Sequence, residues 1–254
     1  MATRTQQEHS DIYHELYERQ CLALSGENDV PRCQWIGISG AHLDGYFCLD
    51  RATPDLVFLR KVSRRLITPF IGLGVQTVIT PAIGTIPLGA LVTEELMAAD
   101  HTLVYSVWAD KTASGEPDMT DFDFVRPGHT ELVTNARVLI VDDIINRRYT
   151  VSRVRDRARG LGAHVVGVAS VASLGDVSAE NLNVPLLHNL CKIKYDSWAP
   201  AACTEQGPCS RLEPVVVNPG LGHGAEYQAK NPEYPGGFVL LAEAERSLRW
   251  VTSR

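Results

Sequence analysis

The segment of residues 136–163, "ARVLIVDDIINRRYTVSRVRDRARGLGA", constrains the fold more than any other part of the chain. Its apolar opening predicts a buried strand over 137–142, and its second half has the spacing of a helix over 150–161. Two adjacent aspartates, Asp142 and Asp143, stand between them. A buried strand, a short polar turn and a helix in this order indicate a parallel α/β sheet, in which ligands bind beyond the carboxyl ends of the strands.

The alternation of strands and helices continues on both sides of this segment. Further strands are predicted within 75–84, 101–109, 164–171 and 185–191 and as two short strands within 32–51, and helices from Ser10 to about Leu24, within 53–70 and within 86–99. The tail from about residue 196 is rich in Pro, Gly and Cys, which predicts irregular structure covering the core. The chain is therefore expected to form a central parallel sheet with helices on both faces.

Composition narrows the class of protein. The 254 residues are 44% hydrophobic and 21% charged, which is typical of a soluble domain with a sizeable core. The net charge of -6 gives no general attraction to nucleic acid or acidic membranes. No apolar run is long enough for a transmembrane helix, and the polar N-terminus lacks the apolar segment of a signal peptide. We therefore expect a cytoplasmic protein, with no nucleic-acid or membrane partner and with six reduced cysteines.

Residues 112–129, "TASGEPDMTDFDFVRPGH", interrupt the alternation. They mix Gly, Pro and Ser with acidic residues and show no hydrophobic period, so a long loop or flap is predicted. Long loops inside compact domains are usually functional or mobile.

The adjacent carboxylates Asp142 and Asp143 repel each other. That repulsion costs stability unless a cation or sugar hydroxyl groups occupy the pair. The alternative is a helix-capping aspartate with a solvated neighbour.

Three stretches of the chain, taken together, resemble the type I phosphoribosyltransferases, and in particular orotate phosphoribosyltransferase-like proteins. "SGAHLDGYFCLD" (39–50) resembles their N-terminal hood hairpin, "VITPAIGTIPLG" (78–89) their pyrophosphate loop, and "VLIVDDIINRRYTV" (138–151) their ribose-phosphate signature. The stretches keep the family's order and span about residues 35–172. The resemblance implies an α/β core over 1–195, with a hood at about 30–50 and a flap at about 112–129. An irregular Cys/Pro/Gly-rich tail, 196–254, would pack on that core.

The resemblance also implies a reaction. The 5-phosphoribosyl group of phosphoribosyl pyrophosphate would pass to a nitrogenous base, an orotate-like pyrimidine or another heterocycle, and pyrophosphate would leave, with Mg²⁺ as cofactor. Catalytic roles fall to Lys111, which reaches the pyrophosphate, and to Asp142 and Asp143, which face the ribose and meet the metal indirectly, through a Mg²⁺-bound ligand. The backbone of Ala82, Ile83 and Gly84 would bind pyrophosphate, and the 5-phosphate would be held by Asn146, Arg147, Arg148, Tyr149 and Thr150. Relatives of this type are commonly homodimers.

Two departures from the family pattern leave alternatives open. The phosphate loop of the family reads like T-T-G-G-T, whereas Arg148 and Tyr149 stand here where glycines let phosphate approach the backbone. These side chains either line an altered pocket, occlude it, or point to solvent. An occluded pocket favours a second hypothesis, in which the protein is a non-catalytic sensor of phosphoribosyl pyrophosphate or a nucleotide. In addition, Ile38 and the segment 173–178 replace a lysine and an arginine of orotate-specific members, so a base other than orotate fits equally well.

The remaining polar residues allow more than one reading. His42, Asp44 and Tyr46 of the hood either contact the base or belong to a hairpin turn. Cys203 and Cys209, with Cys191 and His188 upstream, are spaced more widely than the usual zinc pair. Reduced thiols are therefore favoured over a zinc site. The third hypothesis for the function is a zinc- or partner-binding protein that has kept the fold as a relic scaffold. The arginines of the helix 150–161 indicate a solvated face rather than a nucleic-acid surface.

Overall fold

The computed structural model describes residues 11–27, 30–37, 39–113, 120–146, 148–218 and 221–241. The chain divides into two compact units. Unit 1 contains residues 52–193 together with 11–14, and unit 2 combines residues 15–51 with the segment from Lys194 onward. This division differs from the boundary predicted near residue 195, because the hood segment groups with the tail rather than with the core.

A six-stranded sheet, in the order β10-β9-β8-β5-β6-β7, forms the centre of unit 1. All neighbouring strands are parallel except β6 and β7, which confirms the predicted α/β class. The elements of unit 1 are α2 (Leu56–Ile67), η2 (Thr68–Phe70), β5 (Thr77–Pro81), α3 (Ile86–Asp100), β6 (Tyr105–Ala113), β7 (Thr120–Asp123), α4 (His129–Val133), β8 (Arg137–Ile145), α5 (Tyr149–Gly160), β9 (His164–Leu174) and β10 (Leu187–Ile193).

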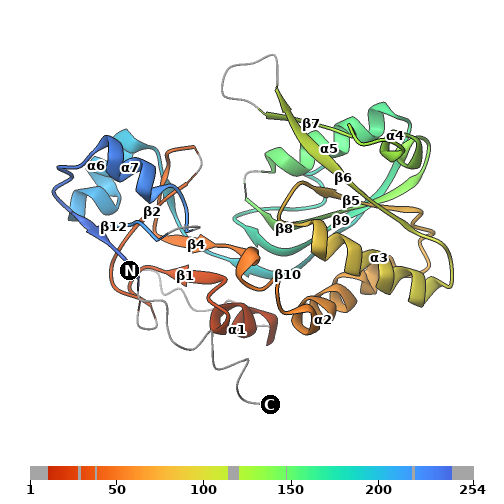
Figure 1. Cartoon of the computed structure of the whole chain (residues 1–254), viewed down its shortest axis with the longest axis horizontal. Coiled ribbons are helices and arrows are strands. Elements are labelled where there is room, and N and C mark those ends of the chain that lie inside the picture. The colour runs from red at the N-terminus through yellow and green to blue at the C-terminus, as the bar shows by residue number, and fades with distance from the viewer. Residues whose placement is uncertain are drawn as a thin grey trace. The chain divides into compact units, whose positions relative to one another are not determined.

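Helices cover both faces of this sheet (Figure 1). On one face, Val151 and Val154 of α5 pack with Val138 and Ile140 of β8 in a single buried cluster. On the other face lie α2 and α3, and α3 approaches β5 so closely that a Cβ atom on Gly89 would lie 2.4 Å from Cγ2 of Thr80. No helix among the described residues has both the length and the apolar character needed to cross a membrane.

The first helix is shorter than predicted. α1 (Asp11–Glu18) ends six residues before Leu24, and β1 (Leu22–Leu24) follows it. Gln20 adopts a positive φ of 57°, and the backbone N–H of Cys21 donates to the carbonyl of Leu16 at 2.8 Å. This left-handed cap ends a helix even without glycine, and the local sequence did not indicate it.

The predicted flap is partly a regular strand. β6 continues to Ala113, and β7 returns antiparallel to it, with Lys111 opposite Phe122. Residues 114–119 lie outside the described residues. Phe122 and Phe124 are buried and alternate with Asp121 and Asp123, a period of two that predicts a half-buried strand. Within the loop or flap expected over 112–129, residues 112–113 and 120–123 are therefore strand.

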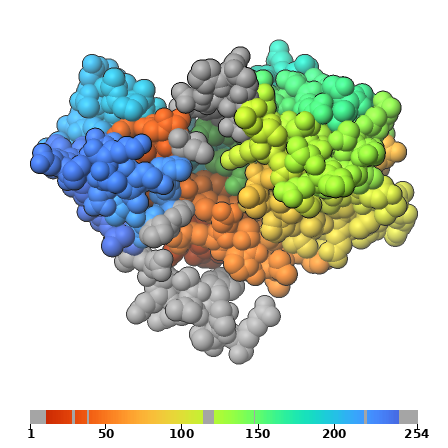
Figure 2. All heavy atoms as spheres, turned by 45° about the horizontal axis from the view of Figure 1, so that its top comes forward, coloured from red at the N-terminus to blue at the C-terminus, as the bar shows by residue number. Residues whose placement is uncertain are grey.

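Unit 2 is built from small sheets and short helices. Its elements, apart from the end of α1, are β1, β2 (Trp35–Ile36), β3 (His42–Leu43), β4 (Gly45–Phe47), η1 (Leu49–Arg51), β11 (Ser197–Trp198), α6 (Pro200–Gln206), η3 (Pro208–Arg211), β12 (Val215–Val216), α7 (Gly224–Lys230) and β13 (Phe238–Val239). Trp35 and Leu43 of the hood are buried in one cluster with Val216 and Leu221 of the tail. Figure 2 shows the orange hood atoms against the blue tail atoms. The tail is thus less irregular than predicted, because it completes the hood's core.

Candidate functional site

Three neighbouring strands of unit 1 bring the predicted catalytic residues to one edge of the sheet. β5 lies between β8 and β6, with Ile79 opposite Ile140 and Pro81 opposite Ala109. Two residues further along the outer strands stand Asp142 and Lys111. In a parallel sheet the carboxyl ends of adjacent strands lie side by side. The carboxylates and the lysine therefore flank the turn that follows β5.

The turn after β5 presents its backbone to solvent. Ala82 is half-buried, Ile83 and Gly84 are exposed, and the peptide bond between Ala82 and Ile83 is cis. The N–H of Ala82 donates to the carbonyl of Ala109, which fixes the start of the turn against β6. Thr85 is the N-cap of the 15-residue helix α3, and its hydroxyl donates to the carbonyl of Pro81. The positive end of a long helix therefore lies directly behind an exposed turn, an arrangement that attracts anions.

The two aspartates differ in burial. Asp142 is 5% exposed and Asp143 is half-buried, and both lie inside β8, which extends beyond the predicted end at residue 142. The N–H of Asp143 donates to Oδ1 of Asp142 at 3.0 Å. Burial raises the pKa of Asp142 well above its usual value, and the neighbouring charge of Asp143 raises it further. A bound cation or hydroxyl donor would offset this cost.

Lys111 lies on the exposed side of β6. The acidic residue beside it, Asp110, is engaged elsewhere, because Arg126 binds both of its carboxylate oxygens at 3.0 Å. That guanidinium holds the pKa of Asp110 below its usual value. Among the described residues, no carboxylate forms an ion pair with Lys111. Its ammonium group is thus available to an anionic ligand at the edge of the sheet.

The predicted phosphate loop leads from β8 into α5. Asn146 and Arg148 are exposed, Tyr149 and Thr150 are half-buried, and Arg147 lies outside the described residues. Arg148 adopts a positive φ of 63° at the N-cap of α5. This is the left-handed conformation that glycine adopts without strain. The backbone has therefore kept a glycine-like turn although the residue is arginine.

Tyr149 contacts its own helix. The guanidinium carbon of Arg153 lies 5.1 Å from the centre of the Tyr149 ring, a cation–π distance. The two residues are one helical turn apart, so their side chains share a face of α5.

Ion pairs between α5 and β7 were not foreseen from the sequence. Arg157 contacts Asp123 at 2.7 Å, and Arg153 contacts Asp121 at 3.4 Å. The alternation of acidic and aromatic residues in β7 could have indicated this face. These contacts agree with the interpretation of the helix arginines as a solvated face and add ion pairs to it.

The predicted base contacts all belong to the hood of unit 2. His42 is only 2% exposed, and its Nδ1 lies 2.7 Å from Oε1 of Gln34. Burial also lowers the pKa of His42. Oδ1 of Asp44 accepts from the backbone N–H of Asp196, and Tyr46 packs at the side of the hood–tail cluster. A direct contact between His42 and a base is disfavoured, because its imidazole is enclosed by the interior of the unit.

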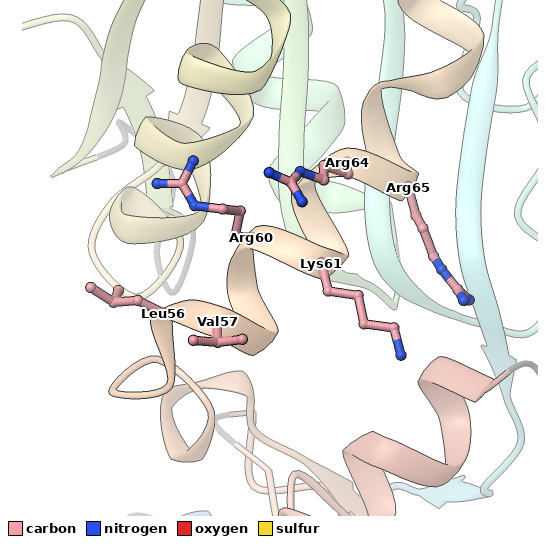
Figure 3. A pocket seen from close by; sticks show the side chains of 6 residues that line it. All are labelled: Leu56, Val57, Arg60, Lys61, Arg64 and Arg65. Carbon is pink, nitrogen blue, oxygen red and sulfur yellow. The ribbon is translucent and has the colours of Figure 1, made fainter. Parts of the chain in front are cut away.

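An open cavity of about 500 Å³ lies elsewhere on unit 1, along α2 (Figure 3). The residues that line it all belong to that helix: Leu56, Val57, Arg60, Lys61, Arg64 and Arg65. Two of its cations are already paired with α3, since Arg60 contacts Glu94 and Glu95 at 3.0 Å and Arg64 contacts Glu95 at the same distance. The strand ends contribute nothing to its lining. We therefore place the candidate site at the sheet edge and not in this cavity.

Comparison with known proteins gives relatives of a single kind by sequence. The chain is 29% identical over 167 residues to an orotate phosphoribosyltransferase of Chlorobaculum parvum, a match that covers 65% of this chain and 77% of the relative. It is 28% identical over 165 residues to the orotate phosphoribosyltransferase of Desulforamulus reducens, with 65% and 78% covered. No protein-family model matches the chain.

The fold has a counterpart among solved structures. The crystal structure of orotate phosphoribosyltransferase from Aeropyrum pernix superposes with a TM-score of 0.50 at 17% identity. The match covers 70% of this chain and 92% of that one. At this identity the structural similarity supports a shared fold and nothing more.

Proposed function

We propose that this chain, an orotate phosphoribosyltransferase-like member of the type I phosphoribosyltransferases, transfers the 5-phosphoribosyl group of phosphoribosyl pyrophosphate to a nitrogenous base. One observation carries the proposal. Asp142, the exposed turn of residues 82–84 and Lys111 stand on three adjacent parallel strands, at the same edge of the sheet. This edge is where α/β folds bind their ligands.

The chemistry of the transfer explains these residue types. Breaking the bond between the anomeric carbon and pyrophosphate develops positive charge on the ribose and negative charge on the leaving group. Carboxylates near the sugar and a cation near the leaving oxygens therefore stabilise the transition state. We assign Asp142 and Asp143 to the ribose side, and Lys111 and the backbone of Ala82, Ile83 and Gly84 to the pyrophosphate. The ribbon of β6 and β7 would shield the site from water, which limits hydrolysis of the activated sugar.

The donor set at the sheet edge fits Mg²⁺. Magnesium prefers oxygen ligands and keeps several of its waters, so it binds through one or two carboxylates and the phosphates of a substrate. Asp142 and Asp143 supply such carboxylates, directly or through a water or hydroxyl group that the metal holds. When bound, the ion would neutralise charge on the departing pyrophosphate.

The 5-phosphate would lie at the start of α5. The positive end of this 12-residue helix directly follows Arg148, its N-cap residue. We assign binding of the 5-phosphate to Arg148. Its side chain is exposed and forms no ion pair with any described residue. A guanidinium binds phosphate through two parallel hydrogen bonds, so it can replace backbone donors that a glycine loop would offer. Asn146, Tyr149 and Thr150 remain proposed neighbours of the phosphate, and the proposed contact through Arg147 falls outside the described residues.

For the base we propose only a chemical class, a nitrogenous heterocycle. The relatives are named for orotate, but residues 173–178 contribute no arginine here, and Ile38 lies outside the described residues. Asp44 and Tyr46 remain the proposed contacts of a nitrogenous heterocycle. We also propose a homodimer in the cytoplasm.

A panel assay tests the function. The full-length protein, phosphoribosyl pyrophosphate and Mg²⁺ are incubated with each of several purine and pyrimidine bases, and released pyrophosphate is measured. Base-dependent release is expected for at least one member, and Lys111→Ala should lower the rate about 100-fold because one charge in the transition state loses its partner. Isothermal calorimetry with phosphoribosyl pyrophosphate and Mg²⁺ runs in parallel. If the protein neither binds that ligand nor releases pyrophosphate, the proposed function is wrong.

A non-catalytic sensor is the second candidate. The observation that favours it is the arginine at the left-handed position of the phosphate loop, where a side chain crowds an approaching phosphate. Binding of phosphoribosyl pyrophosphate without release of pyrophosphate for any base would select the sensor. The antiparallel ribbon beside Lys111 favours the enzyme, because a sensor has no need to exclude water.

A further inference from the structure

A cluster of potential metal ligands lies in unit 2, separate from the residues assigned to phosphoribosyl transfer. His42 of β3 comes from the hood, Cys203 of α6 and Cys209 of η3 from the tail, and all three are buried. One ligand atom from each lies within 4.8 Å of the others. Cys191 and His188, which the sequence offered as partners of these cysteines, belong instead to β10 of unit 1.

A fourth donor completes the cluster. Oε1 of Gln34 lies 3.6 Å from Sγ of Cys209, 3.9 Å from Sγ of Cys203 and 2.7 Å from Nδ1 of His42. Sγ of Cys209 is 3.3 Å from the same imidazole nitrogen. Oε1 of Gln34 can only accept, so without a metal Nδ1 of His42 carries the proton and donates to it. Coordination of a metal at Nδ1 would move that proton to Nε2.

Three of these separations are close to those in a tetrahedron around zinc. Zinc–sulfur bonds of about 2.3 Å and bonds to nitrogen or oxygen of about 2.0–2.1 Å put ligand atoms about 3.4–3.8 Å apart. The three distances that involve sulfur and Gln34 or His42 fall at or near this range. The pair formed by His42 and Gln34 would separate by about 0.7 Å on coordination.

The surroundings orient the ligands. Nε2 of Gln34 donates to the carbonyl oxygen of Glu213 at 2.7 Å and to the hydroxyl of Tyr234 at 2.8 Å. A carbonyl can only accept, so this bond determines the amide orientation and directs Oε1 to the cluster. The backbone N–H of Cys209 donates to Sγ of Cys203 at 3.2 Å. Such outer contacts are what hold metal ligands in place and favour a thiolate.

We propose that unit 2 binds one Zn²⁺ ion through His42, Cys203 and Cys209, with Oε1 of Gln34 as the fourth ligand. Coordination releases the two thiol protons, and two thiolates cancel the charge of the ion. A neutral complex is compatible with a buried site, whereas an unbalanced charge would be costly there. Thiolate and imidazole ligands disfavour hard ions such as Mg²⁺ and Ca²⁺, and a tetrahedral set of two sulfurs and a nitrogen is typical of zinc. The ion would join the hood to the tail, segments that are far apart in the sequence, and its role would be structural.

Metal analysis of purified full-length protein tests the site. The protein is produced in zinc-supplemented medium, purified with a reductant and without chelators, and analysed by mass spectrometry of the metal. About one zinc per chain is expected. Cys209→Ala should lower zinc affinity more than about 100-fold, since even outer contacts are worth 10- to 100-fold. Cys33→Ala is the matched control, because Cys33 is a buried cysteine of the same unit outside the cluster and should keep the metal.

A second measurement does not depend on how a variant folds. Wild-type protein reconstituted with Co²⁺ should show the visible absorption of a tetrahedral ion together with a sulfur-to-metal charge-transfer band. Absence of both zinc and the cobalt spectrum in the wild type would overturn the proposal. Equal loss of metal from Cys33→Ala and Cys209→Ala, or a disulfide between Cys203 and Cys209 in peptides of freshly purified protein, would also overturn it. None of these readouts depends on phosphoribosyl transfer.

Discussion

At the scale of single residues, the acidic pair in β8 is maintained at a cost to stability. Asp142 has lost nearly all contact with solvent and lies beside a second carboxylate, so its charged form is disfavoured. The sequence predicted this tension from two adjacent aspartates at the end of an apolar strand. Which of the two is buried depended on the neighbouring strand, where Ser170 of β9 lies opposite Asp142. The local sequence does not contain that information.

Asp142→Asn should separate binding from stability. The folded pKa of Asp142 is raised above the ordinary 3.8, so the folded state holds this proton more tightly and stability falls as pH rises from that value through the folded pKa. An asparagine side chain does not ionise, so the variant does not lose this stability as pH rises. In urea unfolding without ligand, the variant should be more stable than the wild type at neutral pH and equally stable at low pH. Affinity for phosphoribosyl pyrophosphate should fall. Lower stability at neutral pH would contradict the burial argument.

Arg148 allows a paired test. Both Arg148→Ala and Arg148→Gly remove the guanidinium, so each should weaken binding of phosphoribosyl pyrophosphate about tenfold in calorimetry. Only glycine relieves the left-handed backbone, so Arg148→Gly alone should raise the free energy of unfolding, by about 1 kcal/mol. The alanine variant is the control for the lost side chain. Tighter binding by Arg148→Gly would show that the arginine obstructs the phosphate.

At the scale of elements, the register of β5 with its neighbours builds the site. The apolar segment 75–84 predicted a strand that breaks at Pro81, and the following helix was predicted within 86–99. Both are confirmed as β5 and α3. The close approach of the two was not predictable, because it depends on a glycine that meets Thr80 across a tertiary contact.

Gly89→Ala tests this contact. The new methyl group would lie 2.4 Å from Cγ2 of Thr80, so α3 must shift, and we expect a loss of about 1–3 kcal/mol in the free energy of unfolding. Displacing α3 also displaces the turn of residues 82–84, so affinity for pyrophosphate should fall. Gly160→Ala in α5 is the control, because nothing lies within 4 Å of its added carbon. Equal effects of the two substitutions in urea unfolding would rule out crowding as the cause.

At the scale of the whole molecule, the hood and the tail, which are far apart in the sequence, share one core. The hood and the tail were predicted as parts of different regions, but the N–H of Gln34 donates to the carbonyl of Pro214, and the N–H of Val216 donates to the carbonyl of Gln34. Neither the hood nor the tail by itself encloses the apolar residues of unit 2.

Ending the chain after Ile193 should therefore unfold the hood. The amide of Gln34 loses its partner, the carbonyl of Pro214, and Trp35 loses its packing against Val216 and Leu221, so hydrogen exchange of hood peptides should accelerate by several orders of magnitude. Peptides from β8 and β9 of unit 1 serve as the internal reference. Hood amides that stay protected in the shortened chain would show that the hood folds without the tail.

The sequence by itself determined the alternation of strands and helices in unit 1, the parallel sheet, and the positions of Asp142, Asp143 and the turn after β5 toward the carboxyl ends of their strands. These features depend on local periodicity and on residues close together in the chain, such as 136–163. Tertiary structure decided the partners of the distant residues: Lys111 beside the turn after β5, and His42 beside Cys203 and Cys209. Strand register and packing bring such residues together, and no spacing along the chain encodes them.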